Sequence, residues 1–124
     1  MVLTDRASPV AVAVEVQSEL RRLEQQIRWS AEKADGLLEL LGRDRPGVVV
    51  SKLLILRSTA TTRELARRYS ATLATAYPAK TETVVEALTQ AGTPWPGPGI
   101  AWVRIDGEKA SLLRHPPRGV ALGR

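Results

Sequence analysis

The sequence predicts an α+β fold that is mostly α: a long N-terminal helix, a group of shorter helices and a C-terminal β-hairpin. Apolar residues recur with heptad spacing over residues 16–41, two later segments carry helix start and stop signals, and Asp106-Gly107 separates two alternating segments. The chain has 124 residues, the usual size of one domain. Its 44% hydrophobic and 25% charged residues are typical of globular proteins.

The first helix is expected to start at Ser8-Pro9, because serine caps helices and proline is tolerated at the first helical position. Residues 10–16 also alternate valine with smaller or polar residues, which would suit a short strand, and that alternative stays open. Gly42 and Pro46-Gly47 then end the helix. The apolar stripe is spaced by fours and threes and consists of Val16, Leu20, Leu23, Ile27, Ser30, Ala34, Leu37 and Leu41.

A helix of about thirty residues is ~45 Å long, longer than a small globule needs for its own core. We therefore expect the stripe to form a homodimer interface through Val16, Leu20, Leu23, Ile27, Ala34, Leu37 and Leu41. A parallel coiled coil would oppose Glu19 and Glu24, so an antiparallel pair, or a helix laid across both protomers, is preferred. The alternative is a monomer whose helix folds back on its own core. Residues 1–47 are expected to be this dimerisation helix, and residues 115–124 a basic flexible tail.

Residues 48–57 form an apolar segment that fits either a buried helix or a central strand, and the helix signals that follow favour a helix. A second helix is expected from Thr61-Thr62 through RELARRY, because threonines precede it and Glu64 lies early in it. A third is expected over residues 78–92, which begin with Pro78 and end with Gly92. Between them, either the second helix continues to about Tyr77 or a short extra helix intervenes.

Asp106-Gly107 predicts a two-residue hairpin turn. In that register Arg104 lies opposite Lys109 and Trp102 opposite Ser111. Alternate residues then form an apolar face for packing on the helices, made of Ala101, Val103, Ile105, Ala110 and Leu112. Like charges directly opposite each other are unfavourable, so the Arg104–Lys109 pair suggests an anionic ligand.

The order of helices followed by this hairpin over residues 48–114 resembles the winged helix-turn-helix family of DNA-binding domains, with RELARR and VVEALTQAG as its most characteristic parts. The resemblance implies that the later helix reads the major groove and that the hairpin contacts the phosphate backbone. The groove residues would be Lys80, Thr81 and Thr83, or Thr72 and Thr75 if that helix begins earlier. The backbone contacts would come from Arg57, Arg63, Arg67, Arg68, Arg104 and Lys109.

Charge is distributed unevenly along the chain. Residues 1–47 hold 7 basic and 8 acidic side chains, whereas residues 48–124 hold 11 basic and 5 acidic ones. The second part therefore carries +6, which favours an anionic partner, above all double-stranded DNA. We expect a small dimeric transcription regulator in the cytoplasm, and the predominance of arginine over lysine suggests a bacterial source. The alternative is a winged-helix module that binds a protein partner.

Catalytic chemistry has little support in the composition. The chain has no cysteine and one histidine, His115, which leaves no thiol nucleophile and too few imidazoles for a zinc site. No paired-carboxylate, phosphate-loop or metal-ligand spacing is present. No apolar segment approaches the ~20 residues that span a bilayer. We therefore expect neither an enzyme nor a cofactor.

Overall fold

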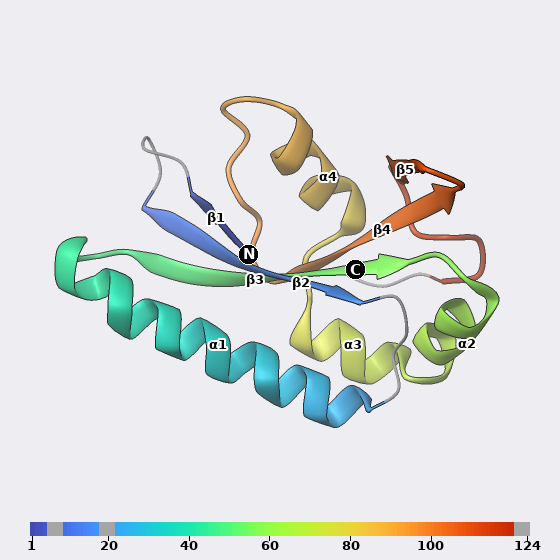
Figure 1. The fold of residues 1–124 in the computed structure, drawn as a ribbon, viewed down its shortest axis with the longest axis horizontal. Coiled ribbons are helices and arrows are strands. Elements are labelled where there is room, and N and C mark those ends of the chain that lie inside the picture. Colours follow the sequence, from blue (N-terminus) through green and yellow to red (C-terminus); the bar gives the residue numbers. More distant parts are fainter. Residues whose placement is uncertain (5–8, 18–21, 121–124) are drawn as a thin grey trace.

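The computed structural model describes residues 1–4, 9–17 and 22–120, which form a mixed five-stranded sheet with four helices (Figure 1). The strands are β1 (Val2–Thr4), β2 (Val10–Gln17), β3 (Val49–Arg57), β4 (Gly99–Asp106) and β5 (Lys109–Leu112). The helices are α1 (Leu23–Asp44), α2 (Ala60–Arg68), α3 (Ser70–Ala76) and α4 (Thr81–Thr89). The predicted mostly α fold, with a long N-terminal helix before a winged helix-turn-helix-like domain, is therefore wrong.

The strands lie in the sheet in chain order. β2, β3 and β4 run parallel, and β1 and β5 are antiparallel strands at the two edges. Since β2 precedes residue 47 and β3 follows it, the boundary that we expected at this position falls inside a connection between neighbouring strands of one sheet. The N-terminal and C-terminal parts of the chain share this sheet.

β2 corrects the expected start of the first helix. Its valines alternate with smaller residues and pair with β3 from Val10 opposite Val49 to Gln17 opposite Leu56. Both faces of the strand are covered, because Ala11 is buried on one side and Val12 and Val14 on the other. The period of two was therefore the correct signal, and β-branched valine favours it. Ser8, the proposed cap, lies outside the described residues.

β3 is the central strand, so the prediction of a helix over residues 48–57 is also wrong. It pairs with β2 on one side and with β4 on the other. Leu53, Leu54 and Leu56 are almost fully buried. A strand covered on both faces reads as a continuous apolar segment, which is why periodicity could not distinguish it from a buried helix.

Helices cover both faces of the sheet, and alternate residues of β3 point to different helices. Leu54 and Leu56 belong to a core cluster that includes Ala66 of α2 and Leu73 of α3. Leu53 belongs to a second cluster that includes Val84 of α4. The two helices expected to form a helix-turn-helix therefore lie on opposite faces of the sheet, as Figure 1 also shows. The short helix α3 between them confirms one of the two alternatives for residues 70–77.

The stripe of α1 packs on the chain's own sheet. α1 contacts β2 and β3, its Leu23 and Ile27 pack against the first core cluster, and its Ser30 and Ala34 are buried. The Tyr77 hydroxyl reaches Ser30 Oγ at 3.1 Å across this layer. Leu37 and Leu41 are half-buried, Val16 lies on β2 with 57% of its surface exposed, and Leu20 lies outside the described residues. α1 therefore packs on the sheet of its own chain, and its length gives no reason to expect a second subunit.

The C-terminal hairpin forms as predicted, but its register differs by two residues. Asp106 lies opposite Lys109 and Arg104 lies opposite Ser111. The turn residue Gly107 has a φ of 60°, which glycine adopts without strain. Because the shift is even, the same side chains still share a face. The predicted burial is wrong in part, since Ile105 and Ala110 are exposed, whereas Trp102 on the other face is buried. The repulsive pairing of Arg104 with Lys109, which suggested an anionic ligand, does not exist.

Candidate nucleic-acid interface

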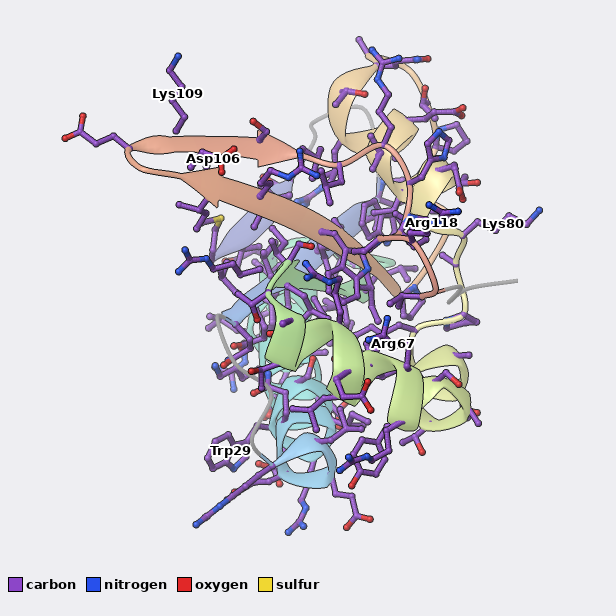
Figure 2. The ribbon with its side chains drawn as sticks, turned by 90° about the vertical axis from the view of Figure 1, so that its right-hand side faces the viewer. Trp29, Arg67, Lys80, Asp106, Lys109 and Arg118 are labelled. Carbon is purple, nitrogen blue, oxygen red and sulfur yellow. The ribbon has the colours of Figure 1, made fainter. Side chains whose placement is uncertain are left out.

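Arginines gather where α2 meets the segment that follows β5, residues 113–120. Both lie at the carboxyl ends of the parallel strands (Figure 1), and Figure 2 views this end with Arg67 and Arg118 on it. The C-terminal segment is held against α2, because Val120 is buried in the same core cluster as Ala66 of α2. We call this surface the basic end and define it as Arg63, Arg67, Arg68, Arg114 and Arg118.

α2 begins where it does because Thr59 caps it. The Thr59 hydroxyl accepts a hydrogen bond from the Thr62 backbone N–H at 3.1 Å. Residues four apart lie on one side of a helix, so Arg63 and Arg67 share a side. A Cβ added at Gly119 would lie 3.3 Å from Arg67 Nη1. The C-terminal segment therefore runs directly beside the Arg67 guanidinium.

Few carboxylates neutralise the basic end. Arg67 pairs with Glu64 at 3.2 Å, and the Arg63 guanidinium donates to Ser58 Oγ at 3.0 Å. Arg68, Arg114 and Arg118 are exposed and form no ion pair within the part of the chain that the structure describes. An exposed group of guanidinium groups from two segments is suited to phosphate oxygens.

The other residues predicted to contact the DNA backbone, Arg57, Arg104 and Lys109, do not belong to the basic end. Arg57 ends β3 on the face of the sheet that carries α4, and is half-buried. Arg104 and Lys109 lie on the hairpin, where Asp106 and Glu108 balance them. Figure 2 shows Asp106 and Lys109 near the hairpin tip, apart from Arg67. The hairpin therefore carries no net charge.

The predicted groove residues are dispersed. Thr81 is 1% exposed and its hydroxyl donates to the Ile100 carbonyl at 3.2 Å, so its side chain holds α4 to β4 instead of facing a partner. Lys80 is exposed just before α4, and Thr83 is half-buried on α4. Thr72 and Thr75 lie on α3, across the sheet from α4. These side chains do not form one surface that could enter a groove.

His115 and Glu82 connect the C-terminal segment to α4. His115 Nδ1 lies 3.1 Å from a Glu82 carboxylate oxygen, and both side chains are partly exposed. The pKa of Glu82 is lowered, first by a hydrogen bond from its own backbone N–H, then by the hydrogen bond and charge of His115 and by the nearby Lys80. A lowered carboxyl pKa contributes stability that is present at neutral pH and lost as the pH falls through that pKa.

We expect His115→Ala to raise the Glu82 pKa only part of the way to its ordinary value, because the backbone N–H remains the larger cause. Following the Glu82 carboxyl carbon by NMR during acid titration measures this directly. Glu86, on the same helix, serves as the internal reference. An unchanged Glu82 pKa, or a full return to the ordinary value, would contradict the interaction or its rank.

Comparison with known proteins gives no assignment: no family model, no curated protein and no solved structure matches this chain. Among the residues that the structure describes, none of the helices combines the length and apolar character needed to cross a bilayer. Within the same ranges, no three histidine, aspartate or glutamate side chains gather in a way that could hold a metal ion.

Proposed function

We propose that this chain is a non-catalytic nucleic-acid-binding domain whose basic end contacts the phosphate backbone. The observation that carries the proposal is the convergence of arginines from α2 and from residues 113–120 on one end of the molecule, with Glu64 as the carboxylate that pairs with one of them. A cytoplasmic location, where bacterial nucleic acid lies, belongs to the proposal.

Recognition of the backbone fits the arrangement better than recognition of base sequence in a groove. A groove-reading helix must present several adjacent polar side chains to base edges. On α4 the first-turn threonine Thr81 is buried, and Glu82 and Glu86 add negative charge. Exposed arginines such as Arg68 and Arg118 bind phosphate without reference to sequence. The proposal therefore concerns affinity for nucleic acid and does not depend on a homodimer.

The salt dependence of binding tests this proposal. We expect the affinity for a fluorescein-labelled DNA strand and for its duplex to fall steeply between about 50 and about 200 mM salt. The double variant Arg67→Ala/Arg118→Ala should reduce the slope of log affinity against log salt by about 2, because each phosphate contact contributes about one. Fluorescence anisotropy measures both quantities.

Arg43→Ala is the matched control, because Arg43 is an exposed arginine in the last turn of α1 and pairs with Glu39 at 3.9 Å. Figure 1 places that turn at the opposite end of the molecule. We expect this variant to bind like the unmodified protein. Absence of salt-dependent binding, or an equal loss in Arg43→Ala, would refute the proposed role of the basic end.

A further inference from the structure

A cleft of about 430 Å³ opens between the start of α1 and the junction of α2 with α3. We call it the Tyr69 cleft. Its described lining consists of Arg22, Leu23, Glu24, Gln25, Arg28, Leu65, Tyr69 and Thr72. Its size is within the range of small-ligand sites, which runs from about 300 to about 1,000 Å³.

The lining combines an apolar wall with a charged rim. Leu23 and Leu65 also pack against the core, so this wall is anchored. Tyr69 lines the cleft and is 42% exposed. Arg22 and Arg28 are exposed, and Glu24 is the carboxylate among the described lining residues. An aromatic ring beside guanidinium groups suits a planar base that carries a phosphate.

α2 connects the Tyr69 cleft to the basic end. Leu65 of α2 and Tyr69, the residue that caps the end of α2, both line the cleft. Arg63 and Arg67 share another side of α2, and Arg67 lies beside the C-terminal segment. At 100° per residue Arg68 projects from the outer surface between these two sides. A phosphate chain bound at the basic end can therefore pass Arg68 and reach the cleft.

We propose that the ligand is single-stranded nucleic acid, with an unpaired base in the cleft against Tyr69 and its phosphates on the arginines. This inference rests on the proposed function, since it names the kind of nucleic acid that the same surface binds. A paired base cannot enter a cleft beside the backbone without leaving its stack, which costs a few kcal/mol. A single strand presents its bases without that cost.

Three labelled probes test the inference: an oligothymidylate of about 12 nucleotides, an abasic chain of the same length, and a duplex of the same length. The abasic chain keeps the phosphates and lacks the bases. Stacking of a base on an aromatic side chain corresponds to about a 5- to 150-fold gain in affinity. We expect oligothymidylate to bind more tightly than both other probes by a factor in this range.

Tyr69→Leu should lower the affinity for oligothymidylate to about that of the abasic chain and leave binding of the abasic chain unchanged. Tyr69→Phe keeps the ring and should restore oligothymidylate binding. Trp29→Leu is the matched control. Trp29 is a 50% exposed aromatic residue on α1, the helix that forms one side of the cleft, but it is not among the described lining residues. Thermal unfolding followed by circular dichroism checks that each variant is folded.

Equal affinity for oligothymidylate and the abasic chain would overturn the base site while leaving the phosphate-binding function intact. Tighter binding of the duplex, no effect of Tyr69→Leu, or an equal effect of Trp29→Leu would overturn the base site as well. If none of the three probes binds in a salt-dependent way, the proposed function itself fails.

Discussion

Replacing Trp102 by alanine is expected to destabilise the protein by about 3–5 kcal/mol, the usual cost of truncating a buried tryptophan. Trp102 has 0% of its surface exposed and pairs with Leu56 in the centre of the sheet. It packs in the cluster that joins β3 and β4 to α2, α3 and Val120. Its removal leaves a cavity that regular sheet pairing prevents the backbone from closing. Urea unfolding followed by far-ultraviolet circular dichroism measures the loss.

Trp102→Phe separates the effect of side-chain volume on stability from the effect of the buried indole N–H. In the part of the chain that the structure describes, Trp102 Nε1 is a buried donor without a hydrogen-bond partner. Phenylalanine keeps a large aromatic ring and removes this donor, whose burial costs about 1–3 kcal/mol when unsatisfied. We therefore expect Trp102→Phe to cost much less than Trp102→Ala. Equal losses would contradict the cavity argument and indicate that the indole N–H is satisfied.

β3 shows where the local sequence was ambiguous between a helix and a strand. Seven of the ten residues 48–57 are apolar, and only their neighbours in the sheet make them a strand. The helix signals after Thr59 are genuine, since α2 starts there, but they do not determine what precedes them. These signals nevertheless led us to expect a helix over residues 48–57. Long-range pairing, which a local pattern does not contain, decided the fold.

The stripe of α1 illustrates a different limit. Periodicity identified Ser30 and Ala34, which are buried, and Leu23 and Ile27, which pack against the core, but it could not identify what covers them. The expectation of a partner helix came from assigning residues 10–16 to the same helix, which made it longer than α1 (Leu23–Asp44). Once β2 and β3 lie beneath α1, its apolar side is covered by the same chain.

The candidate site was accessible to sequence reasoning only in part. The cluster Arg67-Arg68 and the charge of the C-terminal half could be read directly from the sequence. The approach of the C-terminal segment to Arg67 accompanies the burial of Val120, which no local pattern indicates. Likewise, the Tyr69 cleft unites residues of α1 with residues some forty positions later. A surface formed by segments that lie far apart in the sequence can be identified only once the fold is known.

Replacing Gly99 by alanine is expected to destabilise the protein by about 3 kcal/mol, the upper part of the usual range for overpacking a core. A Cβ at this position would overlap Val84 Cγ2 and lie 3.3 Å from the Ala79 Cβ. Val84 is fully buried in α4, and a β-branched side chain in a helix has essentially one χ1 rotamer, so it cannot turn away. Glycine at residue 99 is what lets α4 approach β4 closely. Urea unfolding gives the difference.

A double-mutant cycle assigns this cost to the contact with Val84. Val84→Ala removes the overlapping methyl group, so Gly99→Ala should cost less in that background, with a coupling of about 0.5–3 kcal/mol. Gly36→Ala is the control for the substitution itself: a Cβ there meets nothing within 4 Å. Because Gly36 lies inside α1, alanine should stabilise the protein by about 0.5–1 kcal/mol. Additive losses at residues 84 and 99 would show that the overlap is relieved by movement of α4, and would contradict the close approach as the reason for glycine.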